Sequence, residues 1–96
     1  MSDLNHQTHS LDIEFNDNSI LSSLFGVNDI NIQTLEKINN VKIKYRGNKV
    51  KILGSVKSIK ITKKELLNLF EEAKKGIDID EDKIKDIKSM LSMEID

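Results

Sequence analysis

The segment Val41–Gly54 constrains the fold of this chain most, because apolar and basic residues alternate in it on both sides of Gly47-Asn48. Alternation with a period of two predicts a strand with one buried face, and two such runs joined by a Gly-Asn turn predict a tight β-hairpin. A two-residue turn also fixes which residues face each other, namely Arg46 and Lys49, Tyr45 and Val50, Lys44 and Lys51, and Ile43 and Ile52. The predicted hairpin therefore has one apolar face and one cationic face.

The cationic face of the predicted hairpin brings like charges together. Its members are Lys42, Lys44, Arg46, Lys49 and Lys51. Like charges directly across a ladder destabilise it, on the scale of the about 0.2–1 kcal/mol that cross-strand pairs contribute. Two explanations stay open at this point. An anionic ligand would relieve the repulsion, or the lysines only prevent the strand from pairing with another sheet edge.

The composition is typical of one soluble globular domain. The chain has 96 residues, of which 38% are hydrophobic and 32% charged. This length is close to that of one domain with a modest core, and the hydrophobic share is too high for a disordered chain. The chain has no cysteine, which excludes disulfides, thiolate catalysis and cysteine-ligated zinc.

Charge is unevenly distributed, although the formal net charge is only −1. Residues 41–64 contain nine Lys or Arg and no acid, whereas residues 65–96 contain ten acids and five Lys. Such asymmetry creates a local positive field that can attract an anionic ligand.

The first ten residues are polar and are predicted to be a disordered tail, residues 1–10, ahead of a single domain at 11–96. The tail contains His6 and His9, but a His-x-x-His pair without a third ligand does not predict a metal site. No apolar run approaches the ~18 residues of a membrane span, and the N-terminus does not resemble a secretory leader. We therefore expect a cytoplasmic protein with no membrane partner.

The remaining elements follow from helical spacing and capping residues. Alternation of Leu11, Ile13 and Phe15 predicts a first strand. Helices are predicted from a cap at Asp17 or Asn18 to Gly26, from Asn28-Asp29 to Asn39-Asn40, from Ser55 to Gly76, and after a cap at Asp80. The predicted order is strand, helix, helix, strand, strand, helix, helix, which defines an α+β fold.

Three motifs carry a resemblance to a known family. They are Phe25-Gly26-Val27-Asn28-Asp29, Arg46-Gly47-Asn48 within the hairpin, and Leu66-x-x-Leu69-Phe70-x-x-Ala73-x-x-Gly76. At this separation they resemble the N-terminal region of PhoH-like proteins, from about Leu24 to Gly76 and more loosely to Leu91. The resemblance implies a KH-like domain of type I order, with a three-stranded antiparallel sheet packed on helices. It also implies a bacterial cytoplasmic protein linked with RNA metabolism and phosphate starvation.

In the PhoH-like family this domain precedes a P-loop ATPase domain, but the chain contains no Gly-x-x-x-x-Gly-Lys-Ser/Thr. Without that loop it has nothing to cradle nucleotide phosphates. We therefore expect no enzymatic activity, no catalytic residue and no cofactor in this chain, with ATP and Mg²⁺ belonging only to the missing ATPase domain. That ATPase domain and an RNA-processing protein are the protein partners implied. The chain is expected to be a domain cut from a longer protein or a truncated gene product.

KH modules clamp the nucleic-acid backbone with a Gly-x-x-Gly loop between two helices. The corresponding residues here are Gly26, Val27, Asn28 and Asp29, so an acid replaces the second glycine. We expect Asp29 to be a cap or first-turn residue of the following helix, where it would occupy the amides that a phosphate needs and also repel the phosphate. Tyr45, the only tyrosine, is expected to pack in the core rather than to stack on a base.

The basic residues are therefore the predicted nucleic-acid contacts, and they favour affinity without sequence preference. They are Lys42, Lys44, Arg46, Lys49 and Lys51 of the hairpin, with Lys57 and Lys60 at the start of the long helix. The predicted function is weak, sequence-tolerant binding of RNA or another single-stranded nucleic acid, as an accessory domain of a PhoH-like ATPase. The alternative is a protein-interaction or oligomerisation domain whose degenerate loop no longer binds RNA.

Overall fold

The structure is a computed structural model that describes residues 8–94. Its elements are β1 (His9–Glu14), α1 (Asn18–Phe25), a short 3₁₀ turn η2 (Val27–Asp29), α2 (Ile30–Asn39), β2 (Lys42–Arg46), β3 (Lys49–Gly54), α3 (Val56–Lys74) and α4 (Glu81–Glu94). This order confirms the α+β prediction. The strand β1 begins at His9, two residues before the predicted start of the domain. Residues 1–7 of the predicted tail, His6 among them, lie outside the described residues.

The three strands form one antiparallel sheet in the order β1-β3-β2. All four predicted pairings of the hairpin are confirmed, with Arg46 opposite Lys49 at the turn and Ile43 opposite Ile52 further along. On its other side β3 pairs with β1, which places Leu11 opposite Ile52 and Ile13 opposite Val50. The central strand is therefore β3, and the rows through Lys49 to Leu53 each contain one residue from each strand.

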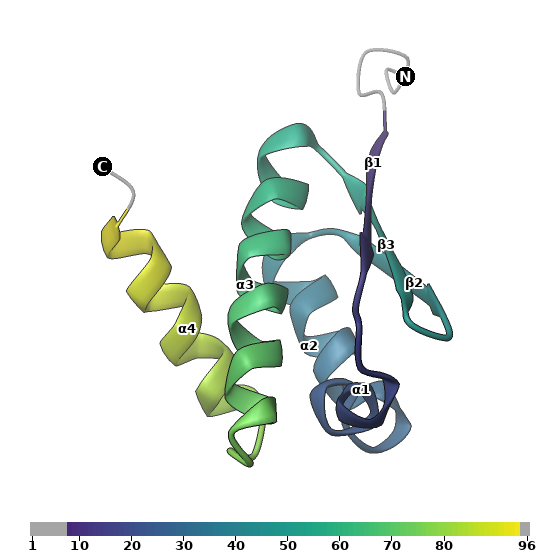
Figure 1. The fold of residues 1–96 in the computed structure, drawn as a ribbon. Helices are drawn as coiled ribbons and strands as arrows, with labels where there is room; N and C mark the ends of the chain where they lie inside the picture. The colour runs from purple at the N-terminus through teal and green to yellow at the C-terminus, as the bar shows by residue number, and fades with distance from the viewer. Residues whose placement is uncertain (1–7, 95–96) are drawn as a thin grey trace.

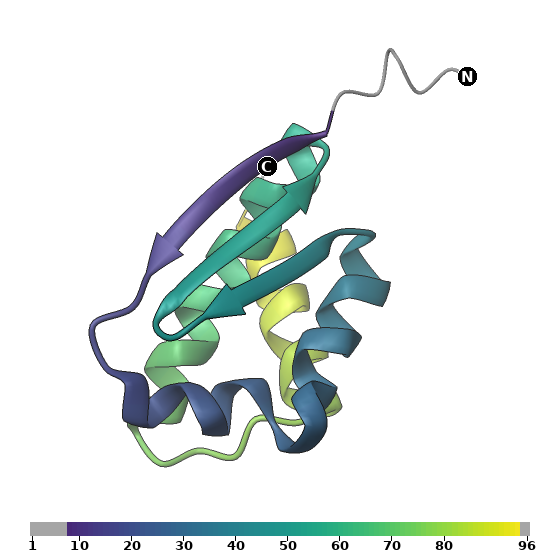
Figure 2. The same ribbon diagram turned by 90° about the vertical axis from the view of Figure 1, so that its right-hand side faces the viewer.

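The sheet has one covered and one open face. In Figure 1 the sheet is seen from its edge, with α3 against one side and α4 beyond α3. In Figure 2 the sheet lies in front of the helices, and no described element covers its near face. The core lies between the sheet and α3, where the side chains of Val50, Ile52, Leu66 and Leu69 are almost completely buried. Functional groups that need solvent are therefore confined to the open face of the sheet, the loops and the helix surfaces.

The helices α1, α3 and α4 begin at capping residues that the sequence predicts. The Asp17 carboxylate accepts from the Ser19 amide at the start of α1, and the hydrogen bonds from Ser19 lower the pKa of Asp17. The Ser55 hydroxyl accepts from the Ser58 amide before α3, and the Asp80 carboxylate accepts from the Lys83 amide before α4. Gly26 and Gly76 follow α1 and α3 with φ of 82° and 84°. Left-handed backbone of this kind favours glycine.

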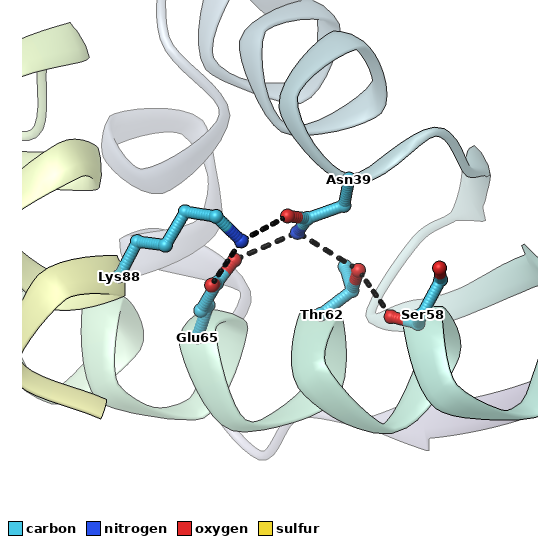
Figure 3. A network of polar contacts seen from close by, with 5 residues as sticks. All are labelled: Asn39, Ser58, Thr62, Glu65 and Lys88. Carbon is cyan, nitrogen blue, oxygen red and sulfur yellow. Dashed lines mark hydrogen bonds and ion pairs between the residues drawn. The ribbon is translucent and has the colours of Figure 1, made fainter. Parts of the chain in front are cut away.

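A buried polar network joins α2, α3 and α4 (Figure 3). Glu65 is only 1% exposed, and its carboxylate accepts from the Asn39 amide at 2.7 Å and from the Lys88 ammonium at 3.3 Å. Lys88 also donates to the Asn39 side-chain oxygen at 2.7 Å, and Asn39 donates to the Thr62 hydroxyl. Every charged group in this network has a partner of opposite charge or a hydrogen bond, and these interactions offset the desolvation cost of burying it.

Two properties of the described residues concern metal binding and membrane insertion. Within residues 8–94, no three side chains of His, Cys, Asp or Glu come close enough to hold one metal ion. None of the described helices is both long enough and apolar enough to cross a membrane.

Candidate nucleic-acid interface

The open face of the sheet carries the five hairpin cations that the sequence singles out. Side chains of β2 and β3 on the face away from the helices include Lys42, Lys44, Arg46, Lys49 and Lys51, and all five are exposed. They form two cross-strand pairs near the turn, Arg46 with Lys49 and Lys44 with Lys51. The neighbouring apolar residues Ile43, Val50 and Ile52 are buried on the other face. The sorting of residues between the two faces is therefore as predicted, and we call these five residues the hairpin cations.

Two carboxylates from β1 lie on the same open face. Asp12 is the register partner of Lys51, with 3.9 Å between a carboxylate oxygen and the ammonium nitrogen, and Glu14 is the register partner of Lys49. Each of these two rows therefore runs from an acid on β1 through a lysine on β3 to a cation on β2. Part of the repulsion within the hairpin is relieved inside the molecule, since the two acids lie beside the two central lysines. Five cations against two acids still leave the face positive.

Asp12 and Glu14 are not among the residues predicted for this face, although the sequence contains a signal for their position. They alternate with Leu11 and Ile13, so the period of two already places both acids on the solvent side of a strand. What the alternation cannot reveal is the neighbour of that strand. Only the pairing of β1 with β3 brings the acids beside lysines.

The lysines at the start of α3 lie on a different surface. Lys57 and Lys60 line a groove between α3 and α4, together with Lys64. Because α3 separates α4 from the sheet, this groove lies away from the open face (Figure 1). The structure thus does not join the two predicted groups of contacts into one surface.

Tyr45 lies at the margin of the core. Its position in the alternation places it on the covered side of the sheet, and its ring packs against Phe25 with 4.4 Å between ring centroids. The residue is nevertheless 42% exposed, and its hydroxyl donates to the two Asp29 oxygens at 2.7 and 2.9 Å. This hydrogen bond raises the pKa of Tyr45, because ionisation would place two negative charges side by side. The prediction of core packing is correct for one face of the ring only.

Asp29 lies at the N-cap position of α2, as predicted, but the predicted capping by its side chain is wrong. Its side chain makes no capping hydrogen bond to α2, and its backbone is left-handed with φ of 60°. The physical reason is the competing donor: the Tyr45 hydroxyl holds the carboxylate on the side of the loop that faces the hairpin. The negative charge predicted for this loop is present all the same. A phosphate that approached Gly26, Val27 and Asn28 would meet the Asp29 carboxylate, so the loop is a poor anion clamp.

Asn31, which is not among the predicted site residues, anchors the loop between α1 and α2 to the neighbouring backbone. The Asn31 side chain is buried, and its amide donates to the backbone oxygens of Leu24 and Ile79, each at 3.0 Å. The first bond fixes the end of α1, and the second fixes the segment between α3 and α4. An asparagine in the first turn of a helix gives no sequence signal of such a long-range role.

Comparisons with known proteins identify the fold and nothing finer. No protein-family model and no curated protein sequence matches the chain. Among solved structures, Dim2p from Pyrococcus horikoshii OT3 superposes with a TM-score of 0.59 at 19% identity, over 66% of this chain and 40% of Dim2p. A protein of unknown function from Aeropyrum pernix superposes with a TM-score of 0.61 at 14% identity, over 92% of this chain and 52% of that protein. The chain thus spans about half or less of these two proteins.

These likenesses, with the observed order of elements, confirm the predicted fold class: a KH-like α+β domain with a three-stranded antiparallel sheet packed on helices. At such low identity they show the fold alone. The resemblance to PhoH-like proteins is carried by sequence motifs and stays a prediction.

Proposed function

We propose that this chain is a nucleic-acid-binding domain that contacts the phosphates of single-stranded RNA through the hairpin cations. The observation that carries the proposal is the gathering of Lys42, Lys44, Arg46, Lys49 and Lys51 on one exposed sheet face that remains positive after Asp12 and Glu14 are counted. Cations on extended strands contact the backbone of a nucleic acid without reading its bases, so binding is weak and tolerant of sequence.

The rest of the molecule supports contact by this face rather than by the loop. The loop presents the Asp29 carboxylate, and the ring of Tyr45, whose hydroxyl donates to that carboxylate, already packs on Phe25. The open face, in contrast, has a wide shallow depression whose charged lining residues are four cations and two acids, namely Lys44, Arg46, Lys49, Lys51, Asp12 and Glu14. A flexible single strand can lie across such a surface, and a KH-like fold is compatible with this use.

In a longer protein we propose that the domain serves a PhoH-like P-loop ATPase, which it would precede in the chain. The support for this role is the spacing of the Phe25-Gly26-x-Asn28-Asp29 and Arg46-Gly47-Asn48 motifs. The domain would then hold RNA near the ATPase, and the enzymatic chemistry would belong to the ATPase domain.

Reversing two of the hairpin cations tests the site. If all five cations contact phosphates, the logarithm of the binding constant falls with the logarithm of salt concentration with a slope of about −3.5, since each contact to a single strand contributes about 0.7. In the Lys44→Glu/Arg46→Glu variant we expect affinity for a fluorescent twelve-nucleotide oligouridine to fall at least about tenfold and the slope to fall to about −2. Fluorescence anisotropy at several salt concentrations measures both quantities.

A matched control separates a local effect from a change in net charge. The variant Lys60→Glu/Lys64→Glu carries the same change in charge in the groove between α3 and α4. It is expected to keep most of the affinity and the full salt slope. Equal losses in the two variants, or no binding by the unmodified chain at low salt, would rule out the hairpin face as the site.

Removing the two acids of the open face should have the opposite effect. In Asp12→Asn/Glu14→Gln, Lys49 and Lys51 lose the carboxylates that lie beside them in the register, so both become free for phosphate. We expect affinity for the same RNA to rise by about three- to tenfold at low salt, with a smaller gain at high salt because the effect is electrostatic. Unchanged or weaker binding in this variant would mean that phosphate does not approach β3.

A second candidate function is protein interaction or oligomerisation through the degenerate loop. The observation that favours it is the exposure of two aliphatic side chains there, Val27 at 80% and Ile30 at 53%, next to the acidic Asp29. Apolar side chains in solvent are typical of protein contacts rather than of phosphate binding. A mass that rises with protein concentration in the absence of RNA binding would favour this second function.

A further inference from the structure

The groove between α3 and α4 is a second surface with features of a binding site. Residues of α3 that line it are spaced at i, i+3, i+4 and i+7, so they share one side of the helix, and residues of α4 form the opposite wall. They are Lys57, Lys60, Ile61, Lys64 and Glu65 of α3, and Lys88, Leu91 and Ser92 of α4. The groove holds a volume of about 250 Å³.

The lysines of this groove are placed where they destabilise their own helix. Of the three lysines Lys57, Lys60 and Lys64, Lys57 lies in the first turn of α3, where the positive end of the helix dipole disfavours cations, and this turn contains no acid. The three lysines also repel one another at spacings of three and four residues. None of the ion pairs found among residues 8–94 involves any of the three. Folding alone therefore gives no reason for this stripe, whereas an anionic ligand would relieve it.

The other groups in the groove indicate what kind of anion fits. Between the lysines lie the partly exposed Ile61 and the nearly buried Leu91, which offer an aliphatic surface. The Glu65 carboxylate in the wall is already bonded to Lys88 and Asn39, so it does not oppose a negatively charged ligand with an unpaired charge. None of the described residues that line the groove has an aromatic ring on which a nucleotide base could stack.

We propose that this groove binds an acidic segment of a partner protein that inserts an aliphatic side chain between α3 and α4. The lysines would pair with Asp or Glu residues on both sides of that side chain. The volume is smaller than the about 300–1,000 Å³ of small-molecule sites and suits one or two side chains of a peptide. Short segments that dock apolar anchors into a groove between helices are a common mode of recognition. This site is independent of the hairpin cations.

The test begins with a selection, because the partner is not identified. A phage-displayed library of random twelve-residue peptides is selected on the immobilised full chain, and the enriched peptides are made with a fluorescein label. We expect peptides in which Asp or Glu flanks Leu, Ile, Val or Met. Replacing that aliphatic residue by Ser should weaken binding about tenfold, since its burial supplies much of the affinity.

Variants of the chain then locate the binding. In Lys60→Glu/Lys64→Glu we expect the affinity for the selected peptide to fall at least about tenfold, because two attractive charge pairs become repulsive. Lys63→Glu is a control for charge reversal elsewhere on the helix, with half the change in charge, since Lys63 is exposed on the same helix and does not line the groove. It should change the affinity less than about twofold. Circular dichroism of each variant checks that the fold is retained.

Three results would overturn the proposal. The first is a selection that yields no acidic peptides with an aliphatic residue. The second is a selected peptide that binds Lys60→Glu/Lys64→Glu as tightly as it binds Lys63→Glu. The third is that oligouridine, rather than any peptide, loses affinity in Lys60→Glu/Lys64→Glu and keeps it in Lys44→Glu/Arg46→Glu. That last result would assign the groove to nucleic acid and would also remove RNA from the hairpin face.

Discussion

The variant Lys88→Met is expected to lower the free energy of unfolding by about 3 kcal/mol, at the lower end of the range for breaking a buried ion pair. Its partner Glu65 is only 1% exposed, so the carboxylate would keep its charge in the interior with the Asn39 amide as its remaining side-chain donor. The Lys88 side chain is 34% exposed, which is why we do not expect the full range. Urea denaturation followed by circular dichroism measures the loss as a lower midpoint at unchanged slope.

The physical reason is checked by a second variant and a matched control. In Glu65→Gln/Lys88→Met the buried charge is gone, and the new amide can donate to the Asn39 oxygen that Lys88 leaves. This double variant should recover at least half of the lost stability. Lys85→Met removes an exposed lysine from the same helix, and its pair with Glu81 is at the surface, so the loss should stay below about 0.5 kcal/mol. If Lys88→Met is no less stable than Lys85→Met, the network does not hold α4 in place.

Much of the fold could be predicted from the sequence because the signals are local. The hairpin register depends only on a two-residue turn and a period of two, and the helix ends depend on residues such as Asp17, Ser55 and Asp80 that act within one turn. The network around Glu65 gives no such signal. Lysine and glutamate at helical spacing are typical of a solvated surface, and their burial follows only from the packing of α4 on α2 and α3.

The candidate site could be predicted only in part, for the same reason. Alternation assigns the hairpin cations to one face of a strand, and the structure agrees. It does not tell how far the helix layer extends under that strand, and Tyr45 lies where this cover ends, with 42% of its surface exposed. The hydrogen bond from Tyr45 to Asp29 joins residues that are far apart in the chain. The Asp29 carboxylate therefore accepts from Tyr45 instead of capping α2, and only the fold creates this contact.

The loop between α1 and α2 requires glycine at position 26 because of its backbone angles and the close neighbours that a Cβ atom would meet. Gly26 has φ of 82° and ψ of 170°, a region that is essentially restricted to glycine. A Cβ atom there would lie 2.8 Å from the Asn31 amide nitrogen and 2.9 Å from the Ile30 side chain. We expect Gly26→Ala to lower the free energy of unfolding by about 3 kcal/mol, since backbone strain of about 1–3 kcal/mol adds to the disturbance of both Asn31 hydrogen bonds.

Gly47 in the hairpin turn is the matched control for Gly26→Ala. It also has positive φ, 60°, but a Cβ atom would meet nothing within 4 Å. Gly47→Ala should therefore cost only the about 1–2 kcal/mol of a left-handed alanine. Equal losses in the two variants, measured by urea denaturation, would mean that Asn31 yields without cost. A larger loss for Gly26→Ala would show that the degenerate loop is held rigid by the core beneath it, whatever ligand the domain binds.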